Sequence, residues 1–228
     1  MANNSTAGYG CRQTMTVGNT PATGGQSEFT VQGGGSPGAT KAIFKGAPVA
    51  MQTAAGGAGV LGHIQDQTAA LMTDGIVGGN TWAHNTANTN GSLGVFNGAT
   101  FVDANGKPTW TNGLAAAQTS SVDYNTGSNN ITAFVNTNPH QEYTARADAA
   151  VGIASFNTLT NTGYNLNDAG AGVDGQSDCT LDIVNTTGTA NYMWKLVRSA
   201  NVEDQKDLTA AGADIIISYN PQANAYLA

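Results

Sequence analysis

The chain has 228 residues, a formal net charge of −7 and only 10% charged residues, with Gly, Asn, Thr and Ala abundant throughout. Its length suits one all-β domain with a tail, or at most two small domains, and its composition favours strands and turns over helix interiors. The basic residues are scattered singly and no run approaches roughly 20 apolar residues, so we expect no nucleic-acid partner and no membrane-spanning segment.

Residues 1–40 show little apolar periodicity and contain the flexible sequence GGGSP at 33–37. We therefore predict an extended N-terminal arm that does not form a packed core by itself. Ordering such an arm costs about 1–2 kcal/mol per backbone residue, so a fixed arm requires extensive contact with its own body or with neighbouring chains. The first residues lack the basic and apolar regions of a standard export signal, and we expect none.

From Lys41 onward the character changes to short apolar runs bounded by turn residues. This pattern predicts a β-rich body over residues 41–220, followed by a tail at 221–228. No fixed spacing makes the sequence resemble itself, so a solenoid of repeats is not expected. The predicted strands are 42–44, 48–51, 60–64, 75–77, 93–96, 100–102, 131–135, 142–147, 179–184, 192–198 and 214–219.

The dipeptide Asn105-Gly106 is the strongest hairpin signal, because both residues tolerate the positive φ that a tight two-residue turn requires. It predicts that 100–103 and 107–110 form an antiparallel pair. Helical periodicity is limited to 113–119 and 204–211, each long enough for a turn or two only. We therefore predict an all-β fold, with an antiparallel β-barrel or β-sandwich body and an extended N-terminal arm.

The sequence shows no arrangement of residues typical of a catalytic or metal site. His63, His84 and His140 have no histidine partner at metal-ligand spacing, and the Gly-x-Ser-x-Gly turn of a serine nucleophile does not occur. The acidic stretch 168–178 is similar to a calcium-binding loop, but it places glycine at positions where that loop requires oxygen ligands. Calcium binding is therefore kept only as an alternative. We predict no enzyme activity, no catalytic residues, no metal site and no cofactor.

Two further pairs of residues bear on function. Cys11 and Cys179 lie far apart and form no metal-ligand or redox pattern, so free thiols are expected. Tyr192 and Trp194 would share one face of a strand, where they fit either the core or a carbohydrate platform. The core is the simpler interpretation, and the platform keeps a glycan-binding function open.

Several motifs follow one another in a fixed order along residues 94–220. The motifs are GVFNG at 94–98, YTARAD at 143–148, GYNL at 163–166, GQS at 175–177 with Leu181 and Asp182, KLV at 195–197, and DIIISYN at 214–220. This order resembles a family of tailed-phage capsid decoration (cement) proteins, over about residues 92–220. Two positions depart from the family, because Asp174 replaces a threonine and Pro221-Gln222 replaces a terminal histidine.

The resemblance implies a structural protein of the virion that decorates and stabilises the outer capsid surface by bridging subunits of the major capsid protein. It also implies synthesis in the host cytoplasm, no catalytic residue, and neighbouring copies of the chain that meet around a local symmetry axis. Under this hypothesis the arm lies across a neighbouring subunit, and its deletion leaves the body folded. The alternatives are a phage tail or receptor-binding protein that binds glycans, and an extracellular calcium-dependent adhesin. The predicted capsid or neighbour contacts are Tyr9, Arg12 and Phe29 in the arm, and Tyr226 and Leu227 in the tail.

Overall fold

The computed structural model describes residues 4–18, 20–21, 25–31, 43–51, 63–66, 92–102, 105–114, 131–152, 164–167, 175–184 and 194–219. Within these ranges the regular elements are strands, apart from one short 3-10 helix, η1 (Glu203–Gln205). The all-β fold predicted from the sequence is therefore confirmed, and the helical candidate at 204–211 overlaps this single turn only. None of the described residues belongs to a helix long and apolar enough to cross a membrane.

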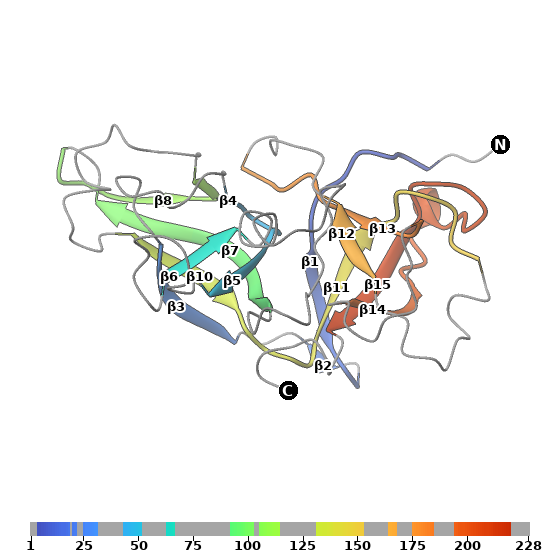
Figure 1. The fold of residues 1–228 in the computed structure, drawn as a ribbon, viewed down its shortest axis with the longest axis horizontal. Helices are drawn as coiled ribbons and strands as arrows, with labels where there is room; N and C mark the ends of the chain where they lie inside the picture. The colour runs from blue at the N-terminus through green and yellow to red at the C-terminus, as the bar shows by residue number, and fades with distance from the viewer. Residues whose placement is uncertain are drawn as a thin grey trace, which may run out of the picture.

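The first of two lobes is a closed β-barrel, which we call the barrel lobe (Figure 1). Its ring consists of β3 (Gln26–Val31), β5 (Pro48–Met51), β6 (His63–Asp66), β7 (Ser92–Val102) and β10 (Thr132–Asn136). Strand β10 pairs with both β3 and β7, and β6 and β5 connect these two in the order β3-β6-β5-β7. Every strand of the ring thus has two partners within the ring. The pairs are antiparallel except β3 with β6, which is parallel.

The predicted hairpin around Asn105-Gly106 is present in the barrel lobe. Strand β8 (Pro108–Thr111) pairs antiparallel with residues 99–102 at the end of β7. Gly106 has a φ of +78°, whereas Asn105 does not have a positive φ, so the turn is not the tight two-residue type. Two short strands, β4 (Ile43–Phe44) and β9 (Gly113–Leu114), pair with each other in the same lobe.

The second lobe is an antiparallel sheet with a short hairpin packed against it. The sheet has the order β14-β15-β11-β1-β2, with β14 (Trp194–Ser199), β15 (Asp214–Tyr219), β11 (Gln141–Arg146), β1 (Arg12–Thr16) and β2 (Thr20–Pro21). The hairpin consists of β12 (Asn165–Asn167) and β13 (Thr180–Asp182). Two isolated β-bridges connect this hairpin to the sheet. Tyr164, next to β12, pairs with Trp194 of β14, and Ala147, next to β11, pairs with Leu181 of β13.

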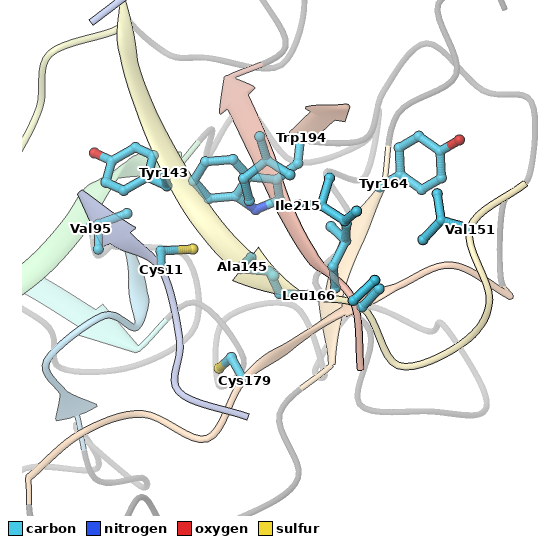
Figure 2. Close-up of a cluster of buried hydrophobic side chains, with 14 of the residues drawn as sticks. Cys11, Val95, Tyr143, Ala145, Val151, Tyr164, Leu166, Cys179, Trp194 and Ile215 are labelled. Atoms are coloured by element: carbon cyan, nitrogen blue, oxygen red, sulfur yellow. The ribbon is translucent and has the colours of Figure 1, made fainter. Parts of the chain in front are cut away.

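Aromatic side chains fill the core of the second lobe (Figure 2). The Trp194 and Tyr219 rings stack with centroids 4.6 Å apart, and Tyr143 meets both rings edge-on. Trp194 has no exposed surface. The structure therefore places Trp194 in the core and not on a carbohydrate platform, while Tyr192 lies outside the described residues. The barrel lobe has a separate core that includes Val49, Phe96, Ala99, Ala133 and Val135.

The described part of residues 1–40 contacts the chain's own body and contributes strands to both lobes. Strand β1 lies between β11 and β2 in the second lobe, and β3 closes the barrel between β10 and β6. The sequence RQTMT of β1 carries no apolar alternation, so its strand conformation depends on hydrogen bonding to β11. Deleting 1–40 would remove β1 and β2 from the second lobe and β3 from the barrel lobe, so the body is not expected to fold without these residues.

The two lobes meet at a packed junction, with β1 between them (Figure 1). Cys11, Val95 and Tyr143 belong to one buried cluster, although Val95 comes from the barrel lobe (Figure 2). The Cys11 N–H donates to the Gly46 carbonyl at 2.9 Å, and the Gly46 N–H donates to the Phe96 carbonyl at 2.8 Å. Backbone hydrogen bonds and apolar packing therefore fix the lobes against each other.

Candidate functional site

The predicted contact residues separate into three groups in the structure. Tyr9 and Arg12 lie together at the junction of the lobes, beside a cavity. Phe29 is partly buried and packs against the core of the barrel lobe, opposite Ala133, so it is not positioned as a surface anchor. Alternation along β3 turns this side chain inward, which the sequence alone did not reveal. Tyr226 and Leu227 lie outside the described residues.

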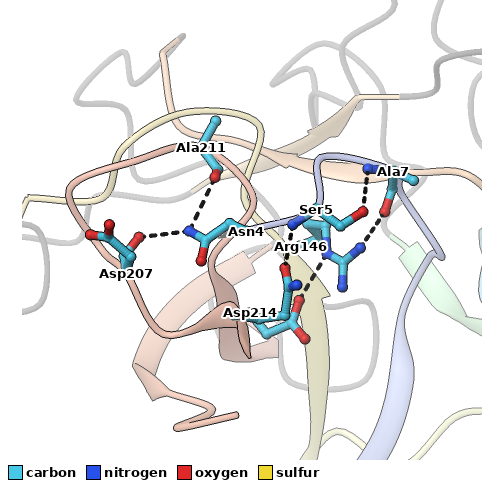
Figure 3. A network of polar contacts seen from close by, with 8 residues as sticks. Asn4, Ser5, Ala7, Arg146, Asp207, Ala211 and Asp214 are labelled. Carbon is cyan, nitrogen blue, oxygen red and sulfur yellow. Dashed lines mark hydrogen bonds and ion pairs between the residues drawn. The ribbon is translucent and has the colours of Figure 1, made fainter. Parts of the chain in front are cut away.

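Residues 4–10 run along the second lobe and are held by polar contacts (Figure 3). The Asn4 side-chain amide donates to the carbonyl oxygens of Asp207 at 2.8 Å and Ala211 at 3.1 Å. The Ser5 N–H donates to the Gln205 side chain at 3.0 Å. These contacts join the N-terminal segment to the loop that precedes β15, and so they set where the following residues enter the junction.

Two arginines lie over the ring of Tyr9, and we call these three residues the Tyr9 clamp. The Arg12 guanidinium carbon lies 4.1 Å from the ring centroid of Tyr9, and that of Arg146 lies 4.7 Å from it. Arg146 also donates to the Ala7 carbonyl at 2.7 Å and to the Asp214 carboxylate at 3.0 Å (Figure 3). Burial, and then the neighbouring Asp214 carboxylate, raise the pKa of the Tyr9 hydroxyl well above its ordinary value. Tyr9 is therefore neutral and serves as a rigid surface for both cations.

A cavity of about 330 Å³ opens beside this clamp, between the two lobes. Apolar and aromatic residues form part of its wall, including Cys11, Val95, Phe96 and Tyr143. Among the described residues, no carboxylate lines it. A second hollow of about 420 Å³ shares Tyr9, Arg12 and Gln176 with the first, and it also contains Arg146 and Asp178. The polar side chains in the wall of the first cavity belong to Arg12, Gln13, Lys45, Asn97, Asn136 and Gln176.

Lys45 lies in the wall of the first cavity, and hydrogen bonds from its backbone N–H and to its carbonyl fix it there. Its N–H donates to the carbonyl oxygens of Asn112 at 2.8 Å and Gly175 at 3.1 Å, and its own carbonyl accepts from the Ser177 N–H at 2.9 Å. The residue thereby joins the barrel lobe to the turn at 175–177, where the GQS motif lies. The position of the Lys45 side chain is thus set by backbone pairing between the lobes.

The basic side chains among the described residues differ in whether they pair with a carboxylate. Arg146 pairs with Asp214, Arg198 pairs with Glu142 at 2.7 Å, and Lys206 lies 3.6 Å from Glu203. Arg12 and Lys45, in contrast, have no carboxylate partner among the described residues. Two positive charges that have no carboxylate partner in the described part of the chain therefore line one cavity, although the net charge of the chain is −7.

Cys11 and Cys179 are both buried and neither is in a disulfide, and burial raises the pKa of the Cys11 thiol, which disfavours the reactive thiolate. No group of three or more His, Cys, Asp and Glu side chains that could hold a metal occurs within the described ranges. Most of the acidic stretch 168–178, and His84, lie outside them.

No family model, curated protein or solved structure matches this chain. The resemblance to phage capsid decoration proteins consequently depends on the sequence motifs alone. In the structure these motifs fall within or beside strands β7, β11, β12, β13, β14 and β15, and at the turn 175–177.

Proposed function

We propose that this chain is a virion structural protein that decorates the outer surface of a phage capsid and stabilises it by bridging major capsid protein subunits. The order of the motifs supports the family, and the exposed surface of β1 is the structural observation that supports an assembly role. The described residues also provide a rigid body of two joined lobes. Such a body can contact two neighbouring subunits at once.

Strand β1 is unusual because it lies inside a sheet and yet remains largely exposed. Arg12, Gln13 and Met15 are exposed along it, although β11 on one side is almost fully buried. Met15 and the adjacent Val17 are 44% and 56% exposed. Fully burying an apolar side chain of this size contributes roughly 1.5–3 kcal/mol, so covering this surface in an assembly would be favourable.

A decoration protein stabilises a capsid by binding the assembled lattice more tightly than it binds free subunits. Contacts from one copy to two subunits achieve this, and contacts between neighbouring copies add avidity. With 10% charged residues, the chain can form contacts that depend little on ionic strength. We therefore place the contact with the major capsid protein at β1 and the β1–β2 turn.

One observation favours a second candidate, a tail or receptor-binding protein that binds glycans. Trp110 on β8 is 50% exposed and lies against Phe134, with ring centroids 5.2 Å apart. Its indole N–H donates to the Asn112 side chain at 3.2 Å, which holds the ring in place. An exposed aromatic ring next to amide groups is a suitable surface for a sugar.

The test is to quantify the protein against the major capsid protein in purified particles and to locate it by cryo-EM. Near-stoichiometric copies outside the shell are expected, whereas a few copies at the tail vertex would contradict decoration and favour receptor binding. A second experiment adds recombinant protein to heads that lack it. Met15→Asp should reduce occupancy without changing the unfolding midpoint, while Val202→Asp, at an exposed apolar position away from β1, is the matched control.

A further inference from the structure

We propose that the cavity between the lobes binds a small oxyanion, a carboxylate or phosphate group, through Arg12 and Lys45. This site does not depend on the capsid proposal, because it would bind such a group in the isolated chain. Both cations line the same cavity of about 330 Å³, and neither has a carboxylate partner among the described residues. The missing negative charge is the main reason to expect an anionic ligand.

Arg12 is held in position before any ligand binds. Its guanidinium lies over the Tyr9 ring at 4.1 Å and donates to the Gln176 side chain at 3.4 Å. The other arginine over the Tyr9 ring, Arg146, already has Asp214 as its counter-ion. A planar guanidinium can form two parallel hydrogen bonds to a carboxylate or phosphate, and little side-chain freedom is lost when it is already ordered.

The wall of the cavity also contains an unused neutral donor. Asn136 is 2% exposed, and its side-chain oxygen accepts a hydrogen bond from the Asn138 N–H at 3.1 Å. Its side-chain nitrogen has no hydrogen-bond partner among the described residues. A buried amide N–H without a partner is unusual, and an acceptor in the cavity would satisfy it. Two cations and this amide together favour an oxyanion over a cation or an uncharged ligand.

The experiment titrates the full chain with inorganic phosphate and, separately, with succinate, at constant ionic strength set by sodium chloride. Isothermal calorimetry gives the affinity, and amide NMR shifts of Asn97 and Asn136 give the location. We expect saturable binding of one of these ligands, with shifts at the cavity. Tighter binding of phosphate would identify a phosphoryl group as the ligand, and tighter binding of succinate would identify a carboxylate.

Charge variants test the residues that carry the site. Lys45→Gln and Arg12→Gln should each weaken binding on the order of tenfold or more. Arg12→Lys, which keeps the charge and loses the paired hydrogen bonds, should weaken it less than Arg12→Gln. Lys206→Gln removes the same charge at an exposed position and should leave the affinity unchanged.

Circular dichroism and the melting temperature without ligand show whether each variant is folded. If Lys45→Gln does not fold, Arg12→Gln and Arg12→Lys still decide the question. The proposal is overturned if neither phosphate nor succinate binds better than chloride at equal ionic strength. It is equally overturned if Lys206→Gln weakens binding as much as the cavity variants do. Capsid attachment is not measured here, so failure of this site leaves the decoration proposal intact.

Discussion

Arg198 of β14 reaches across β15 to Glu142 of β11, and both of its terminal nitrogens donate to the carboxylate, at 3.1 Å and 2.7 Å. The Glu142 side chain is 4% exposed, whereas that of Arg198 is 43% exposed. A buried carboxylate in the middle of the sheet therefore depends on a cation at the sheet edge.

Arg198→Met is expected to lower the free energy of unfolding by about 1–3 kcal/mol, because Glu142 would stay buried without its cation. Adding Glu142→Gln to this variant should recover part of the loss. Urea unfolding at neutral pH measures both effects. Lys206→Met is the control, since its pair with Glu203 is exposed and contributes little. An Arg198→Met protein as stable as the control would show that the pair does not stabilise the sheet.

Trp194→Ala should lower the free energy of unfolding by about 3–5 kcal/mol, because it removes a fully buried ring that stacks on Tyr219. Trp194→Phe should lose less than half as much. It keeps a ring in the core, and it removes an indole N–H that has no hydrogen-bond partner among the described residues. Chemical unfolding followed by circular dichroism compares the two variants. Equal losses would contradict this prediction, because they would show that a phenyl ring recovers none of the stability that the indole supplies.

Stability should fall as the pH rises above about 9. Burial raises the pKa of Cys11 above its ordinary value of 9.0, and it raises those of Tyr9 and Tyr143 above 10.0. The unfolded chain therefore loses these protons first, so alkaline pH favours unfolding and pH below the ordinary values has no effect through these groups. Each group contributes a slope of about 1.4 kcal/mol per pH unit between its two pKa values.

Cys11→Ala isolates the thiol in that pH dependence. Between about pH 9 and about pH 10, the free energy of unfolding of this variant should fall less steeply than that of the unmodified chain, by about 1.4 kcal/mol per pH unit. Urea titrations at a series of pH values give both slopes. Identical slopes would show that the thiol is not shielded from water in the folded state.

Gly8→Ala should detach residues 4–10 from the second lobe. A Cβ at this position would overlap the backbone carbonyl of Asp178, which cannot move aside like a flexible side chain. We expect a loss of about 1–3 kcal/mol and faster hydrogen exchange at the Gly10 N–H, which donates to the Cys179 carbonyl. Ala7→Gly is the control, because the contact of Ala7 with Arg146 uses its backbone carbonyl. Unchanged exchange at Gly10 would show that the segment tolerates the methyl group.

Local sequence patterns were sufficient to predict those strands whose own apolar residues indicate that they are buried. The predicted strands at 48–51 and 214–219 match β5 and β15, and those at 131–135 and 142–147 match β10 and β11 within one residue. The glycine after Asn105 also identified the β7–β8 hairpin. In each of these segments, neighbouring residues carry the information that decides the structure.

Polar strands and the candidate site could not be found in the same way. The sequences of β1 and β3 have few apolar residues, and they become strands because β11 and β10 supply partners from more than a hundred residues later. Tyr9 and Arg12 were predicted as contacts, but Lys45 and Arg146 were not. These two residues reach the junction through long-range pairing, and although Arg146 lies within the YTARAD motif, that motif does not indicate its contact with Tyr9.

The barrel lobe is inserted in the sequence between β2 and β11 of the second lobe, and this order has a consequence for synthesis on the ribosome. Strand β1 leaves the exit tunnel first, but its partner β11 is made only after every strand of the barrel ring. The barrel lobe can therefore close while translation continues, whereas the second lobe must wait for β15. During that interval the newly made β1 has no sheet to join, and its exposed edge is the part of the nascent chain most in need of a chaperone.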